Sequence, residues 1–124
     1  MSTSKIMIVE DCPIHMQMIS NILESERYDL VKATDGEEAL KLALMEPPDL
    51  VVLDVILPKR NGFQICRHLK TTPETLHTKV ILLTSKNQES DRFWGFKQGA
   101  DDYITKPFEP AHLLASIRQL LKKD

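Results

Sequence analysis

Cysteine, glycine and tryptophan are scarce in this sequence, which contains two, four and one of them in 124 residues. Two cysteines are too few for a disulfide framework. The pairs Cys12–His15 and Cys66–His68 fit no standard zinc spacing, so we interpret both thiols as buried structural groups. The four glycines form neither a G-x-G-x-x-G motif nor a P-loop, which argues against a nucleotide-binding module.

Charge and hydropathy exclude further classes. The formal net charge of −2 provides no basic field for DNA or for an acidic membrane surface. No apolar run approaches the roughly 18 residues that span a bilayer. The N-terminus leads directly into a predicted strand, so we expect no signal peptide and a cytoplasmic location. The length suits one domain, residues 1–124.

Short apolar runs alternate with helix-periodic segments along the whole chain. Strands are predicted near residues 5–9, 29–33, 49–54, 79–84 and 102–105. Helices are predicted from residue 13 to about 26, from 36, from 62, from 87 to 98 and from 110. This alternation predicts an α/β fold, with a doubly wound parallel sheet of five strands and five helices. Of the two common strand orders, 2-1-3-4-5 fits five strands and gives a flavodoxin-like fold.

Acidic residues end two of the predicted buried strands. Asp54 follows the aliphatic run 50–53, and Glu10 and Asp11 follow the run 6–9. In the predicted order these strands are neighbours at the switch point, where open α/β sheets bind ligands beyond the carboxyl ends of the strands. Three carboxylates on one edge repel one another unless a cation lies between them. A hard divalent ion, most naturally Mg²⁺, would relieve that repulsion.

Two further strand ends bring a hydroxyl, Thr84, and an ammonium group, Lys106, to the same edge. Mg²⁺ prefers one or two carboxylates together with waters and phosphate oxygens, which leaves room for a phosphoryl group. With the metal and Lys106 offsetting its charge, such a group could approach an anionic carboxylate. Asp54, central on the edge, is then the candidate nucleophile that forms an aspartyl phosphate.

These motifs together resemble a response-regulator receiver domain of the CheY-like type, over essentially the whole chain. The residues that carry the resemblance are Glu10-Asp11, Asp54 with Leu57-Pro58 and Gly62, Thr84-Ser85, Gly99-Ala100-Asp101-Asp102-Tyr103 and Lys106-Pro107-Phe108. The resemblance implies a two-component signalling protein rather than an enzyme. In it, Asp54 would accept a phosphoryl group from the phosphohistidine of a histidine kinase or phosphotransfer protein.

The resemblance also implies a metal site. Asp11 and Asp54 would bind Mg²⁺ directly, together with the backbone carbonyl of Ile56, and Glu10 would act through water. Glu10 stands where many members have Asp, a variant that the family also uses.

The resemblance assigns the phosphoryl group and the switch to other residues. Thr84 and Lys106 would each contact a phosphoryl oxygen, and the Lys106–Pro107 peptide bond would be cis. Tyr103 matches the switch aromatic, which turns inward when Thr84 is drawn to the phosphate. The surface formed by the fourth helix, the fifth strand and the fifth helix would then change shape.

Three aromatic side chains crowd the predicted fourth helix and cannot all face the core. We expect Phe93 to pack in the core. We expect Phe96 or Trp94 to contribute to a partner surface beside Tyr103, because exposed aromatics favour interfaces. The four histidines, at positions 15, 68, 77 and 112, are interpreted as surface or satisfied residues.

Other functions stay open at this point. A haloacid-dehalogenase-type phosphatase also uses Mg²⁺ and a strand-end Asp, but it needs a second Asp where this chain has Ile56. A phosphorelay intermediate, or a pseudo-receiver that binds without phosphorylation, would share the same motifs. We expect no DNA-binding or catalytic effector domain to follow, and therefore expect a protein target for a monomer or weak dimer. The segment 84–100 is similar to standalone receivers of twitching-motility and phototaxis systems, the PilH type.

Overall fold

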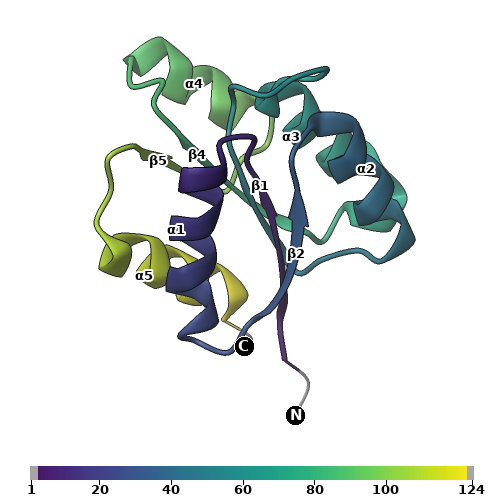
Figure 1. The fold of residues 1–124 in the computed structure, drawn as a ribbon. Coiled ribbons are helices and arrows are strands. Elements are labelled where there is room, and N and C mark those ends of the chain that lie inside the picture. The colour runs from purple at the N-terminus through teal and green to yellow at the C-terminus, as the bar shows by residue number, and fades with distance from the viewer. Residues whose placement is uncertain (1–2, 123–124) are drawn as a thin grey trace.

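Five short strands form one parallel sheet in the order β2-β1-β3-β4-β5, which confirms the predicted topology (Figure 1). The computed structural model describes residues 3–122, so residues 1–2 and 123–124 of the predicted domain lie outside the described residues. The strands are β1 (Lys5–Val9), β2 (Asp29–Ala33), β3 (Leu50–Leu53), β4 (Lys79–Thr84) and β5 (Asp102–Thr105). β3 is shorter than predicted, and Asp54 follows the strand instead of ending it.

Helices cover both faces of the sheet, as the crossovers require. They are α1 (Pro13–Glu24), α2 (Gly36–Met45), α3 (Gly62–Thr71), α4 (Glu89–Lys97) and α5 (Pro110–Leu121), with a short 3₁₀ helix, η1 (Pro73–Thr75). Helices α1 and α5 pack on one face, and α2 and α3 pack on the other (Figure 1). Among residues 3–122, no helix combines the length and the apolarity that crossing a membrane requires.

Side chains alternate between two hydrophobic clusters along each central strand. In β1, Met7 and Val9 join the cluster beneath α2 and α3, whereas Ile6 and Ile8 join the cluster beneath α1 and α5. All four residues of β3 are buried. This two-sided burial explains why the strands have continuous aliphatic runs instead of alternating polar residues.

Local signals in the sequence fix most helix ends. Asp35 accepts a hydrogen bond from the backbone N–H of Glu38 at the start of α2. Asn61 and Gln64 form a reciprocal capping box at the start of α3. Gly99, with a φ of 101°, follows the end of α4 in the left-handed region that favours glycine.

The prediction that Phe93 packs in the core is wrong. Phe93 is 64% exposed, and the residue of α4 that is buried against the sheet is Gly95. A Cβ atom at Gly95 would lie 2.9 Å from side-chain atoms of both Leu82 and Tyr103. The helix therefore approaches β4 and β5 through its smallest residue, and this close approach leaves its aromatic rings at the sides.

The two cysteines lie in different settings. Cys66 is buried in α3, and burial raises the pKa of its thiol to about 12. Cys12 is only partly buried, so the expectation of a buried thiol is confirmed for Cys66 alone. In the part of the chain that the structure describes, no group of three or more His, Cys, Asp or Glu side chains is arranged to hold a metal ion.

Candidate functional site

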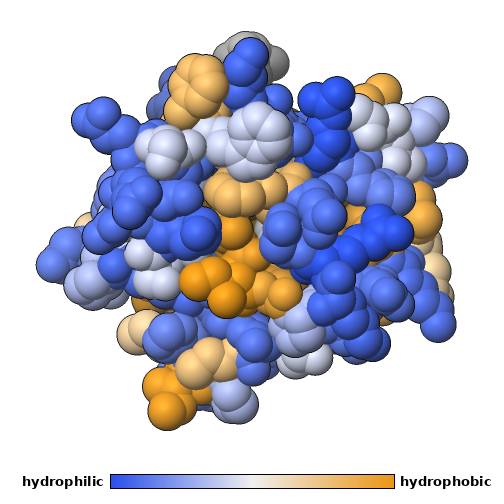
Figure 2. All heavy atoms as spheres, turned by 90° about the horizontal axis from the view of Figure 1, so that it is seen from above, coloured by the Kyte–Doolittle hydropathy of each residue, from blue (hydrophilic) through white to orange (hydrophobic). Residues whose placement is uncertain are grey.

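Four of the predicted site residues meet at the carboxyl edge of the sheet. Glu10 and Asp54 follow β1 and β3, Thr84 ends β4, and Lys106 follows β5. The amide of Asp54 donates to the carbonyl of Val9, which ties the segment after β3 to the end of β1. Seen from above, this edge is a mainly polar surface with a smaller apolar area near its middle (Figure 2).

Lys106 lies between the two buried carboxylates. Its Nζ is 2.6 Å from Oε1 of Glu10 and 3.0 Å from Oδ2 of Asp54. Glu10 is 2% exposed and Asp54 is 7% exposed, so water screens these charges only weakly. The sequence predicted that a cation would separate the carboxylates, and the structure shows that the ammonium group of Lys106 does so.

Burial and hydrogen bonding shift the pKa values of Glu10 and Lys106 in opposite directions. Burial raises the pKa of the Glu10 carboxyl, and the hydrogen bond from Lys106 only partly opposes that rise. For Lys106, burial alone would lower the pKa, but hydrogen bonds to Glu10 and Asp54 outweigh burial and raise it. The lysine therefore stays charged at neutral pH.

Backbone amides hold the remaining carboxylate oxygens. The N–H of Ile56 donates to Oδ1 of Asp54 at 3.1 Å, and the N–H of Cys12 donates to Oε2 of Glu10 at 3.1 Å. Each carboxylate thus has one oxygen on a backbone donor and the other on Lys106. This arrangement fixes the orientation of Asp54 before any reaction.

The donor set is compatible with a hard cation, although the three acids do not converge. Carboxylate oxygens of Glu10 and Asp54 already lie close enough to share one cation, and Mg²⁺ needs only one or two carboxylates besides waters and phosphate oxygens. Asp11 is exposed and does not form a three-residue cluster with the other two acids. The residues therefore fit Mg²⁺ by their chemistry.

Thr84 and Tyr103 occupy neighbouring strands and are both buried. The N–H of Lys86 lies 3.4 Å from Oγ1 of Thr84, a long and weak hydrogen bond. The hydroxyl of Tyr103 donates to the carbonyl of Lys86 at 2.7 Å. Tyr103 is 2% exposed, so its side chain contributes almost nothing to the surface of the protein in this structure. The aromatic ring is already turned inward.

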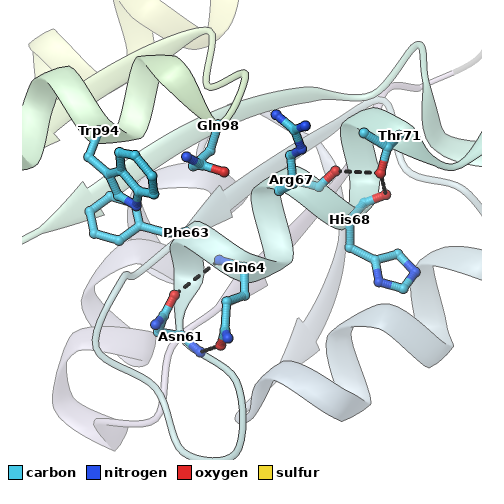
Figure 3. Close-up of a pocket in the computed structure, with 8 residues that line it drawn as sticks. All are labelled: Asn61, Phe63, Gln64, Arg67, His68, Thr71, Trp94 and Gln98. Carbon is cyan, nitrogen blue, oxygen red and sulfur yellow. Dashed lines mark hydrogen bonds between the residues drawn. The ribbon is translucent and has the colours of Figure 1, made fainter.

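Trp94 and Phe96 leave α4 in different directions. The ring of Phe96 lies 6.5 Å from the ring of Tyr103, centroid to centroid. Trp94 instead lines a groove between α3 and α4, together with Phe63 and Arg67 (Figure 3). Phe96, Trp94 and Tyr103 therefore do not form one exposed patch. Phe96 and Trp94 are 43% and 52% exposed and face different neighbours.

The buried hydroxyl of Tyr103 predicts a specific dependence of stability on pH. Burial raises the pKa of Tyr103 from 10.0 to about 12, so the folded state holds this proton more tightly than the unfolded state does. The stabilisation is complete below pH 10 and is lost as the pH rises from 10 to 12. We expect the free energy of unfolding to fall less steeply over that interval in Tyr103→Phe than in the wild type.

Chemical denaturation at several alkaline pH values measures this difference. Tyr28, whose pKa burial also raises, contributes equally to both proteins and cancels in the comparison. The variant starts from a lower stability because it lacks the hydrogen bond to Lys86. Parallel slopes for the two proteins would contradict the predicted role of Tyr103.

The Lys106–Pro107 peptide bond is cis, as predicted. The structure also adds His15 to the site, although the sequence suggested a surface residue or one with its hydrogen bonds made elsewhere. Nδ1 of His15 lies 2.9 Å from Nζ of Lys106. The available signal was its place in the first turn of the helix that follows Glu10 and Asp11.

Comparison with known proteins identifies the fold and its family. The family model for the response regulator receiver domain matches residues 6–118. The chain belongs to this family. Protein PilH of Pseudomonas aeruginosa is 41% identical over 118 residues, which cover 95% of this chain and 98% of that protein. The chain therefore matches nearly the whole length of this relative.

Other relatives are longer than the matched region. The alkaline phosphatase synthesis transcriptional regulatory protein PhoP of Bacillus subtilis is 42% identical over 97% of this chain, and the chain spans 49% of its length. Among solved structures, the receiver domain of the sensor histidine kinase PA1611 from Pseudomonas aeruginosa has a TM-score of 0.89 and 27% identity. The match covers 97% of this chain and 98% of that one, which has a magnesium ion coordinated in its active-site cleft.

Proposed function

We propose that this chain is an active receiver in which Asp54 accepts a phosphoryl group from a histidine kinase or phosphotransfer protein. The environment of Asp54 carries the proposal. Its carboxylate is nearly buried at the switch point of the sheet, with one oxygen on the Ile56 amide and the other on Lys106. A fixed orientation and an adjacent cation suit a nucleophile. Glu10 has the same kinds of partner, but Asp54 follows the strand at the centre of the sheet.

The transfer itself needs few protein groups. An oxygen of Asp54 attacks the phosphorus atom, the O–P bond forms as the P–N bond of phosphohistidine breaks, and the imidazole nitrogen keeps the electron pair. Lys106 would then contact a phosphoryl oxygen in place of Oδ2 of Asp54. The hydroxyl of Thr84, which accepts a long hydrogen bond from the Lys86 amide, would donate to another phosphoryl oxygen.

The proposal includes a magnesium requirement. Asp11, Asp54 and the Ile56 carbonyl would hold the ion, with Glu10 acting through water. When bound, Mg²⁺ would neutralise negative charge that the carboxylates and the phosphoryl group bring together. The magnesium ion in the active-site cleft of the PA1611 receiver supports the magnesium requirement.

The output would come from a shift between two conformations. The ring of Tyr103 lies next to the ring of Phe96 on α4, and its hydroxyl donates to the carbonyl of Lys86. A movement of Thr84 that displaces Lys86 would therefore reach α4 through Tyr103 and Phe96. A protein target would read the altered surface of α4, β5 and α5, with Phe96 as a contact. Trp94 would form part of a second surface, next to α3. The similarity to PilH, nearly all of which the chain covers, supports a standalone role in surface motility.

Asp54→Asn provides the test of this function. We expect intact-mass measurement to show a gain of one phosphoryl group when the wild type is incubated with Mg²⁺ and acetyl phosphate. We expect no gain for Asp54→Asn, and none for the wild type when a chelator removes Mg²⁺. Equal phosphorylation of the variant would contradict the proposal. A wild type that gains nothing from acetyl phosphate or from a phosphorylated kinase would indicate a pseudo-receiver.

A further inference from the structure

Lys106 has three acceptors for its three ammonium protons. Two of them are the carboxylates of Glu10 and Asp54, and the third is Nδ1 of His15 at 2.9 Å. An ammonium group can only donate hydrogen bonds, so Nδ1 accepts and the neutral ring carries its proton on Nε2. The lysine side chain is 10% exposed, and an ammonium proton that is buried without an acceptor would destabilise the site.

The fold directs His15 to this position. Pro13 begins α1 directly after the segment that carries Glu10, and His15 lies in the first turn. Side chains of a helix lean toward its N-terminus, which for α1 lies at the carboxyl edge of β1. His15 also forms a wall of a cavity next to Lys106, together with Met18 and Phe108. Its side chain is 41% exposed, so burial in the core does not explain its orientation.

The three partners of Lys106 would not be equivalent during phosphorylation. Asp54 is the proposed acceptor, and Lys106 must release its Oδ2 to contact a phosphoryl oxygen. Glu10 is the proposed water-mediated magnesium ligand, so its charge would be shared between two cations. His15 is neutral and has no assigned role toward the metal or the phosphoryl group. It can therefore keep its hydrogen bond throughout.

We infer that His15 is a positioning residue that holds the ammonium group of Lys106 in the phosphoryl site through Nδ1. This inference rests on the proposed function of Asp54 and adds a residue to it. Without the acceptor, Lys106 would lose one of its two lasting partners and would sample other rotamers. Phosphorylation would then be slower at saturating phosphodonor, while the donor concentration needed for half-maximal rate would change little.

A set of matched variants tests the inference. In His15→Leu the bulk is kept and the acceptor is lost, and we expect the rate of Asp54 phosphorylation by acetyl phosphate to fall about three- to tenfold. In His15→Asn an amide oxygen replaces Nδ1, and most of the rate should return. Met18→Leu is the control, because Met18 lies on the same helix and lines the same cavity but its thioether is only a weak hydrogen-bond acceptor.

The double variant separates positioning from a general effect on folding. If His15 acts through Lys106, His15→Leu should have no further effect when Lys106 is already replaced by methionine. Equal rates in the wild type and His15→Leu would overturn the inference. So would an additive loss in the double variant, or a His15→Asn variant as slow as His15→Leu.

Nitrogen NMR of the imidazole rings tests the contact without phosphorylation. We expect His15 to show an unprotonated Nδ1 and a protonated Nε2, and we expect the Nδ1 resonance to shift in Lys106→Met, which lacks the ammonium donor. A protonated Nδ1 in the wild type would overturn the inference even if Asp54 is phosphorylated normally. Failure of Asp54 phosphorylation with the expected tautomer present would instead remove the proposed function, and with it the role of His15 in transfer.

Discussion

Lys106→Met is expected to slow the phosphorylation of Asp54 by about 100-fold, the usual scale for losing one charge-stabilising donor in an active site. In the structure Lys106 is the cation between Glu10 and Asp54, at 2.6 and 3.0 Å. Without it, a phosphoryl group would approach two buried carboxylates with no ammonium group beside them. The rate of phosphorylation by acetyl phosphate at saturating Mg²⁺, followed by intact mass, measures the effect.

Lys70→Met is the matched control for this variant. Nζ of Lys70 also has a partly buried setting and an aspartate partner, with distances of 2.8 Å to Oδ2 of Asp101 and 2.9 Å to the carbonyl of Thr78. It lies on α3, and its partner Asp101 precedes β5 at the amino end of that strand. We expect Lys70→Met to lower stability while leaving the phosphorylation rate of the folded protein near that of the wild type. Equal rates in Lys106→Met and the wild type would contradict the assigned role.

Gly62→Ala is expected to destabilise the fold by about 3 kcal/mol, at the upper end of the usual cost of overpacking. A Cβ at this position would lie 2.2 Å from the carbonyl oxygen of Asp54 and 2.7 Å from Cα of Val55. Both are backbone atoms, which cannot rotate away as a side chain can. The amide of Gly62 also donates to the carbonyl of Val55 at 2.8 Å, so α3 begins in direct contact with the phosphoacceptor segment.

Gly95→Ala tests whether the loss of stability depends on contact with backbone atoms or with side-chain atoms. Its added Cβ would lie 2.9 Å from side-chain atoms of Leu82 and Tyr103, which can shift, and alanine favours the helix by about 1 kcal/mol. We expect a smaller loss of stability than in Gly62→Ala, as measured by urea denaturation. We also expect Gly62→Ala to slow phosphorylation in the molecules that remain folded. Equal losses of stability in the two variants would contradict this explanation.

The sheet and its carboxyl edge were predictable because their signals are local and redundant. Each strand is a short aliphatic run with a polar residue directly after it, and the topology then brings those polar residues together. Asp54 and Lys106 are 52 positions apart, yet the strand order alone placed them on one edge. The need for a cation between the carboxylates also followed from electrostatics, although Lys106 itself meets that need in the structure.

The contacts of α4 were not predictable in the same way. Hydrophobic character favoured Phe93 for the core, but packing against β4 and β5 depends on how closely the helix axis approaches the sheet. Gly95 permits a close approach, and the bulky rings then have no space beneath the helix. The inward position of Tyr103 depends on a hydrogen bond to the Lys86 carbonyl, a backbone group that no sequence pattern identifies.

His15 shows a different limit of the sequence. A histidine in the first turn of a helix is compatible with a solvated surface residue and with a ligand of the neighbouring site. Only the position of Nζ of Lys106, 91 residues later in the chain, distinguishes these interpretations. Side-chain contacts between distant segments of this kind require the packed structure, whereas the presence of the segments at one edge does not.

The most direct test of the central claim is to locate the phosphoryl group. Reduction of the phosphorylated protein with borohydride converts an acyl phosphate at an aspartate into homoserine, and trypsin then separates the candidate acids. Asp54 falls in the peptide 42–59, whereas Glu10 and Asp11 fall in the peptide 6–27. We predict homoserine at position 54 in samples that contained Mg²⁺ and no modification of the peptide 6–27. Modification at position 11, or at no aspartate, would contradict the account.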